Sequence, residues 1–204
     1  MRLYRGKMCE ISLLPLSRLP SPAHRQAAEL YWGAFRGKLG RLLGPEAKAL
    51  RLINGVMRPD HGIAAVTPEG RVVGIAGFRS EAGTFVPLSP DAIRLVYGSF
   101  GAAWRLSALH MISEAPDTER FLIEGVAVAP DLQGRGIGTL MLRALSEEAR
   151  ARGFQALRLD VSDQNPRARA LYERLGFEAA AHHRYWLMAP VFGMTGSRVM
   201  LRRL

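Results

Sequence analysis

Apolar residues in the first quarter of the chain recur at helical spacing. After Pro22 they form one face of a predicted helix, at Ala27, Leu30, Tyr31, Ala34 and Phe35. Two glycines interrupt this pattern, and Pro45 favours the start of another helix that runs to about Val56. Before both helices, residues 11–16 favour a short strand.

The next apolar runs have the spacing of strands. Residues 62–66 and 71–78 are predicted to form a hairpin, because the proline and glycine between them suit a tight turn. Residues 80–119 are too many for a hairpin loop and contain an apolar helical stretch over 92–112. Charged residues interrupt that stretch, so it is interpreted as a buried or groove-lining helix rather than a membrane span.

The second half of the chain alternates strands and helices. The expected elements are a strand at 121–129, a helix from 137 to Gly153, a strand at 156–161, a short helix between Asn165 and Gly176, and strands at 177–186 and 197–201. The short helix is sharply defined, because Asn165 can cap it and Pro166 suits its first turn. The expected fold class is α/β (α+β), with a mixed, mostly antiparallel sheet flanked by helices, in a single domain over residues 1–204.

Composition narrows the class of protein only a little. The 204 residues, 48% hydrophobic and 23% charged, suit one well-buried domain. The formal net charge of +10 suits an anionic ligand, but equally a nucleic acid or an acidic surface. The single cysteine excludes an internal disulfide, and the start lacks the pattern of a secretory signal, so a cytoplasmic location is expected.

The glycine-rich turn after residue 130 has the character of an anion-binding loop. Gly134, Gly136 and Gly138 leave the backbone uncovered where it turns into the next helix. The first N–H groups of that helix lack internal partners and lie at the positive end of its dipole. Gln133 and Arg135 are candidate side-chain donors beside them. The turn is therefore predicted to bind a polyphosphate.

The spacing of this turn excludes two common nucleotide motifs. A Walker A loop needs a lysine that is absent here, and a Rossmann fingerprint fails because Thr139 stands in place of its last glycine. What remains, Gln-x-x-Gly-x-Gly after a Val-x-Val strand, resembles the acetyl-CoA signature of the GNAT superfamily of N-acetyltransferases. A second block resembles the later part of the same domain, at Leu159-Asp160-Val161, Asn165-Pro166, Ala168, Leu171-Tyr172 and Leu175-Gly176-Phe177. The resemblance is specific over residues 121–177.

The resemblance implies different functions for three segments of the chain. Residues 1–60 would supply helices on the acceptor side, residues 80–119 would shape the acceptor pocket, and residues 121–177 would bind acetyl-CoA. For the insertion at 80–119, a dimer interface or a cap on the core stays open as an alternative. The strands that end near Val128 and Val161 are expected to splay apart and expose backbone groups to the pantetheine arm. The cofactor-binding residues implied are Val126, Ala127, Val128, Gln133, Gly134, Arg135, Gly136, Ile137, Gly138, Thr139, Asn165 and Tyr172.

Two of these residues also have plain structural explanations. Asn165 is a natural helix cap, while the family's matching asparagine contacts the pantetheine arm. Tyr172 lies seven residues on and shares the Asn165 face of the helix. In the family the matching tyrosine is the general acid for the CoA sulfur, but Tyr172 also belongs to an apolar stripe and could be a core residue.

The general base is left open between two carboxylates and water. An amine acceptor arrives protonated and must lose a proton before attack. Glu124 lies on the central strand among apolar residues, where desolvation would favour its taking a proton. Asp160 is the alternative, although Arg158, two residues away on the same face, could make it an ion-pair partner.

The sequence therefore predicts an acetyl-CoA-dependent N-acetyltransferase with Tyr172 and Glu124 as catalytic residues. The acceptor is an amine on a small molecule, a protein N-terminus or a lysine. No metal site, membrane segment or nucleic-acid partner is expected, and a homodimer is left open. The alternative is a non-catalytic protein that retains the anion-binding turn, either an acyl-CoA-binding sensor or a nucleic-acid-associated module.

Overall fold

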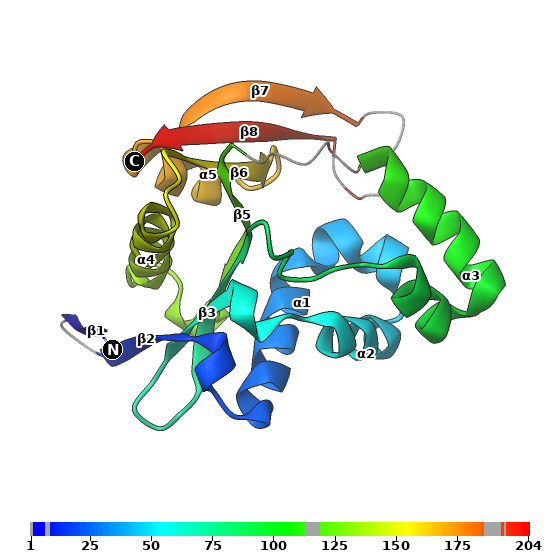
Figure 1. The fold of residues 1–204 in the computed structure, drawn as a ribbon, viewed down its shortest axis with the longest axis horizontal. Coiled ribbons are helices and arrows are strands. Elements are labelled where there is room, and N and C mark those ends of the chain that lie inside the picture. Colours follow the sequence, from blue (N-terminus) through cyan, green and yellow to red (C-terminus); the bar gives the residue numbers. More distant parts are fainter. Residues whose placement is uncertain (1, 7–8, 113–118, 186–192, 194) are drawn as a thin grey trace.

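A computed structural model describes residues 2–6, 9–112, 119–185, 193 and 195–204 (Figure 1). In this part of the chain a single eight-stranded sheet has the order β1-β2-β3-β4-β5-β6-β8-β7. Its strands are β1 (Arg2–Gly6), β2 (Cys9–Pro15), β3 (Gly62–Val66), β4 (Val72–Arg79), β5 (Phe121–Val128), β6 (Ala156–Ser162), β7 (Glu178–Arg184) and β8 (Gly196–Arg203). All neighbours pair antiparallel except β5 and β6, which run parallel.

Five helices cover the sheet in the described ranges (Figure 1). They are α1 (Ser21–Leu43), α2 (Glu46–Val56), α3 (Pro90–Ile112), α4 (Ile137–Ala151) and α5 (Pro166–Arg174). Helices α1, α2 and α3 share one hydrophobic core, with Leu42, Ile53 and Ile93 fully buried in it. Helices α4 and α5 pack into a second core, which contains Met141 and Phe177. The apolar stripes of the helices therefore fold onto opposite faces of one sheet.

The sheet divides where the parallel pair diverges. Strands β5 and β6 pair only at Phe121–Leu157, Leu122–Arg158 and Ile123–Leu159, although both strands continue further. Beyond these positions β5 stays paired with β4, and β6 stays paired with β8 along its whole length. The expected splaying of these two strands is confirmed, and it leaves one edge of each strand facing a gap.

A β-bulge lies in β5 at the start of this gap. Gly77 pairs with Gly125 while the next residue, Phe78, pairs with Ile123, so Glu124 is the extra residue on β5. A bulge bends its strand and re-aims the side chain of the inserted residue. The bulge therefore coincides with the candidate base.

Most predicted elements are confirmed, with changes at their ends. The strand at Arg2–Gly6 was not expected, and the strand expected at 11–16 begins at Cys9 and gives way to a 3-10 turn at Leu16–Arg18. The strand expected at 177–186 is found at Glu178–Arg184, and Trp186 lies outside the described residues. The expected mixed, mostly antiparallel sheet with flanking helices is confirmed.

Helix α3 fits the expected insertion only in part. It is kinked at Gly98, whose φ of 72° is left-handed. Ile93 and Ala102 are buried, but Leu95 and Phe100 are 83% and 93% exposed. The expected buried or groove-lining helix is therefore confirmed for one face of α3, which also places Leu109 in the lining of a cavity at the gap between β5 and β6, while the face with Leu95 and Phe100 is exposed. Across the described ranges, none of the helices combines the length and apolar character that crossing a membrane requires.

Candidate active site

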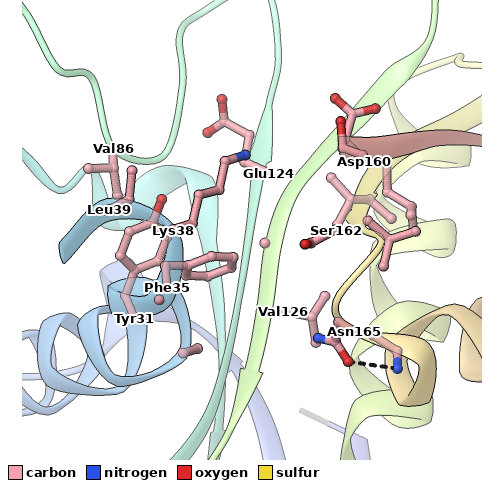
Figure 2. Close-up of a pocket in the computed structure, with 18 of the residues that line it drawn as sticks. Tyr31, Phe35, Lys38, Leu39, Val86, Glu124, Val126, Asp160, Ser162 and Asn165 are labelled. Carbon is pink, nitrogen blue, oxygen red and sulfur yellow. Dashed lines mark hydrogen bonds between the residues drawn. The ribbon is translucent and has the colours of Figure 1, made fainter. Parts of the chain in front are cut away.

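A cavity of about 660 Å³ opens where β5 and β6 diverge (Figure 2). One wall, here called the donor wall, comes from the end of β6 and from α5, and includes Asp160, Ser162, Asn165, Ala168 and Tyr172. The other, the acceptor wall, comes from α1 and from the segment between β4 and α3, and includes Tyr31, Phe35, Lys38, Thr84, Val86 and Leu88. Residues 122–126 of β5 also line it, which places the bulge at the cavity.

The glycine-rich turn has the backbone geometry that anion binding requires. Gly134 and Gly136 have φ values of 80° and 85°, in the left-handed region that residues with a side chain rarely adopt. Gly136 is the N-cap of α4, so the first unpaired N–H groups of that helix follow it directly. Gly134, Arg135 and Gly136 are exposed. These residues fit a polyphosphate at the positive end of the helix dipole.

Gln133 has a different task from the one expected of its side chain. Its Nε2 donates a hydrogen bond of 3.1 Å to the carbonyl oxygen of Val128. Beside it, Arg71 and Asp131 form a two-bond ion pair, at 2.9 and 3.1 Å. The Gln133 amide therefore ties the turn to the end of β5, and its second N–H, the backbone N–H groups and Arg135 are the donors that remain for a phosphate.

The other expected cofactor residues divide between the cavity and its surroundings. Val126 lines the cavity, whereas Ala127 is buried on the other side of β5 and Val128 lies beside the turn. At the start of α4, Ile137 is buried, Gly138 is close to Leu171, and Thr139 is half-buried. The turn and the cavity are thus adjacent parts of one surface, joined by the end of β5.

Asn165 and Tyr172 both line the cavity from α5, as their spacing predicted. The Asn165 Oδ1 accepts a 3.0 Å hydrogen bond from the N–H of Ala168, which confirms the cap. Among the described residues its Nδ2 group has no hydrogen-bond partner. The Tyr172 ring packs edge-on against Phe177, with centroids 5.9 Å apart. Burial raises the pKa of Tyr172 to about 12, so its hydroxyl keeps its proton at neutral pH.

Glu124 lies in a polar setting rather than the apolar one expected for it. Its Oε1 accepts hydrogen bonds from Arg79 Nε at 3.0 Å and from the Thr84 hydroxyl, and its Oε2 accepts one from the Phe85 N–H at 2.7 Å. Arg79 Nη2 lies 2.9 Å away, and the Glu124 side chain is only 14% exposed. These contacts bind the bulge of β5 to the segment after β4. The expectation of apolar neighbours is wrong, because residues far along the chain supply polar partners.

Asp160 keeps the ion-pair partner that its neighbourhood suggested. Arg158 Nη2 lies 3.6 Å from Asp160 Oδ2, and the Asp160 side chain is 29% exposed at the cavity. Both candidate carboxylates therefore reach the cavity, one from its floor and one from the donor wall.

Lys38 is a lining residue that sequence reasoning missed. It follows Phe35 by three positions and so continues the stripe of the first helix, which was the available signal. In Figure 2 its side chain points from α1 toward the end of the cavity where Glu124 and Asp160 lie. Burial lowers the pKa of Lys38, and attraction to Asp160 partly offsets that effect.

Packing holds α1 against the floor of the cavity. A Cβ on Gly125 would lie 2.5 Å from the Phe35 ring, so that ring occupies the space that the glycine leaves. The Tyr31 ring packs against Phe35 at a tilt of 40°, with ring centroids 4.6 Å apart. Burial, and then the Glu124 carboxylate, raise the pKa of Tyr31.

Arg105 links α3 to the end of α1 through hydrogen bonds. Arg105 Nε donates to the carbonyl of Leu42 at 2.7 Å, and Nη2 donates to that of Gly44 at 3.2 Å. Its guanidinium lies 3.9 Å from the centroid of the Tyr97 ring, while the Tyr97 hydroxyl donates to Leu43. The last carbonyls of α1 thereby gain partners, and the acceptor wall becomes one packed unit.

Solved structures share this architecture. An N-acetyltransferase from Staphylococcus aureus Mu50 superposes with a TM-score of 0.63 at 15% identity, over 94% of this chain and 100% of that one. A GNAT family acetyltransferase from Elizabethkingia anophelis, solved with acetyl-CoA bound, has a TM-score of 0.55 at 15% identity, over 95% and 98% of the two chains. At these identities the likeness shows the fold.

Sequence comparison gives the family. A mycothiol acetyltransferase from Beutenbergia cavernae is 30% identical over 146 residues, which are 68% of this chain and 48% of that protein. The chain spans just under half the length of the first curated relatives that it matches. The model of the acetyltransferase (GNAT) family matches residues 24–177, which include the α1 side of the cavity, the glycine-rich turn and α5. The chain belongs to the GNAT acetyltransferase family.

Proposed function

We propose that this protein transfers an acetyl group from acetyl-CoA to a primary amine by direct attack of the amine. The observation that carries the proposal is the gap between β5 and β6, which opens beside the left-handed glycines at the start of α4. An extended, amide-containing chain can add to an open strand edge, and its phosphates can reach a helix N-terminus. Both features lie on one continuous surface here.

The residues present fit acetyl-CoA part by part. The N–H groups after Gly136, with Arg135, would hold the phosphates, and the free edge of β5 near Val126 would bind the pantetheine amides. Asn165 Nδ2 would add a donor on the opposite side, since Oδ1 is already used in the cap. When bound, acetyl-CoA supplies a thioester carbonyl and a thiol leaving group.

Tyr172 is proposed as the general acid. Its hydroxyl lies on the donor wall, where it would protonate the departing sulfur. A group whose pKa is raised to about 12 remains protonated through the neutral range, which this role requires. Tyr31 lines the cavity from the acceptor wall, so the cavity holds two phenols with different neighbours.

The proton of the incoming amine has three possible acceptors. Glu124 is the first, although three hydrogen-bond donors already use its oxygens. Asp160 is the second, and a water held between the two carboxylates is the third. The amine itself would enter along the acceptor wall, past Phe35 and Val86. Small-molecule amines, protein N-termini and lysine side chains are all compatible with this wall.

The proposal is tested by binding and transfer measured side by side. Calorimetry measures acetyl-CoA binding, and thiol release is followed while small amines, aminoglycoside-like antibiotics and peptides are offered as acceptors. Binding with acceptor-dependent thiol release is expected. Tight binding without transfer to any acceptor would favour a non-catalytic sensor, and failure to bind acetyl-CoA would overturn the proposal.

A further inference from the structure

One primary amine of the protein itself lies in the proposed acceptor region. Tyr31, Phe35 and Lys38 are spaced by four and three residues on α1, so they share one face of the helix, and all three line the cavity. Figure 2 shows the Lys38 side chain extending inward from this face. The chain has three lysines, at 7, 38 and 48, and of the two in the described residues, Lys38 lines this cavity and Lys48 does not.

The surroundings of Lys38 leave its nitrogen available for chemistry. Within the ranges that the structure describes, Lys38 forms no hydrogen bond, and Asp160 is its electrostatic partner. The other cationic side chain in the lining, Arg79, is paired with Glu124 at 2.9 Å. Burial lowers the pKa of Lys38, so more of this amine is neutral at a given pH than of an ordinary exposed lysine.

We infer that Lys38 is a self-acetylation site, modified by the acyl-CoA thioester bound in the same cavity. This inference rests on the proposed function. The lone pair of neutral Lys38 Nζ attacks the thioester carbonyl carbon, a C–N amide bond forms, and the C–S bond breaks. One Nζ proton leaves toward Asp160 or solvent while the sulfur gains a proton from Tyr172. The products are one acetyl-lysine and one free CoA thiol.

Proximity favours this reaction over modification of other amines. An amine held in the cavity reacts as part of one assembled molecule, and such arrangements raise rates far above those of bimolecular encounters. Lys48 provides the contrast, because it is exposed on α2 and its Nζ lies over the Tyr97 ring, 5.7 Å from the centroid. Lys48 is absent from the lining of the cavity.

Acetylation of Lys38 would change the acceptor wall. The side chain would lose its positive charge and its nucleophilicity, and the added acetyl group would occupy space beside Phe35. Self-acetylation would therefore proceed when acetyl-CoA is abundant and an acceptor amine is scarce, and it would slow later turnover. An acceptor that fills the cavity would protect Lys38.

The test is a time course with isotopically labelled acetyl-CoA and no acceptor, read by intact mass and peptide mapping. Lys38 is expected to gain label at least about tenfold faster than Lys48 in the same protein. Lys38→Arg should abolish this site while keeping a positive charge, and Lys48→Arg is the matched control that should label like the wild type. Calorimetry of acetyl-CoA on the same samples keeps binding separate from modification.

The pH dependence gives a second readout. Because its pKa is lowered, Lys38 should label faster as pH rises and reach its plateau below the ordinary lysine value of about 10.4. Acetyl-CoA binding with unlabelled Lys38, or equal labelling of Lys38 and Lys48, would overturn the inference and leave the proposed function standing. Failure to bind acetyl-CoA would overturn both.

Discussion

The two walls of the cavity are built in different ways. The donor wall uses local contacts, such as the cap between Asn165 and Ala168, and it faces the free edge of β5, which leads to the left-handed glycines of the turn. The acceptor wall uses side chains that meet distant parts of the chain, such as Phe35 packed on Gly125 and Thr84 hydrogen-bonded to Glu124. A wall of backbone groups can bind the same cofactor while its side chains vary, whereas a wall of side chains determines which acceptor fits.

The largest expected effect comes from removing the proposed acid on the donor wall. Tyr172→Phe should lower turnover by about 100-fold or more, because proton transfer by a positioned side chain contributes on that scale. Acetyl-CoA affinity should change little. Tyr31→Phe is the matched control from the acceptor wall, and equal losses of turnover in the two variants would contradict the assignment.

Straining the glycine-rich turn should weaken the binding of acetyl-CoA more than the binding of the acceptor. In Gly136→Val a β-branched residue must adopt a φ of 85°, which costs about 1–3 kcal/mol, so acetyl-CoA affinity should fall at least about tenfold by calorimetry. Gly153→Val is the matched control, because Gly153 has a φ of 84° just beyond the other end of α4 and so carries the same backbone strain away from the turn. Unchanged affinity in Gly136→Val would mean that the phosphates bind elsewhere.

Glu124 lies on β5 between the two walls, and one variant can separate its structural role from its proposed catalytic role. Glu124→Gln leaves Arg79 without its carboxylate partner, so the free energy of unfolding should fall by about 1–3 kcal/mol in denaturant titration. If Glu124 is also the base, the activity deficit should shrink as pH approaches about 10, where an amine acceptor arrives neutral.

A deficit that stays constant with pH would restrict Glu124 to a structural role. Asp160→Asn, measured over the same pH range, is the comparison. The variant that shows the pH-dependent deficit identifies its replaced carboxylate as the base.

The smallest expected effect separates capping from ligand binding at Asn165. Asn165→Ala should lower stability by about 1 kcal/mol, while Asn165→Asp keeps the cap because aspartate caps equally well. Both variants lose the Nδ2 donor, so both should bind acetyl-CoA about threefold to tenfold more weakly, the value of about one hydrogen bond. Normal affinity in Asn165→Asp would leave Asn165 as a cap only.

The donor wall could be predicted from the sequence because its geometry is local. A proline after Asn165, a glycine at 136 and a seven-residue spacing to Tyr172 each determine backbone or helix geometry within a few residues. The side chains around the acceptor could not be predicted from the sequence, because Lys38, Arg79 and Thr84 meet at the cavity only through sheet pairing and helix packing. The polar partners of Glu124 follow from the bulge in β5, which no local pattern announces.

The gap between β5 and β6 also has a consequence for the stability of the protein. Unpaired strand edges invite association with other chains, and this protein keeps two of them facing each other inside its sheet. A substrate that adds to those edges is then part of the folded structure as well as a reactant. At a hundred times its dissociation constant, such a ligand would add about 2.7 kcal/mol to the apparent stability. The supply of acetyl-CoA in the cell would in that way govern how long the protein survives, apart from how fast it works.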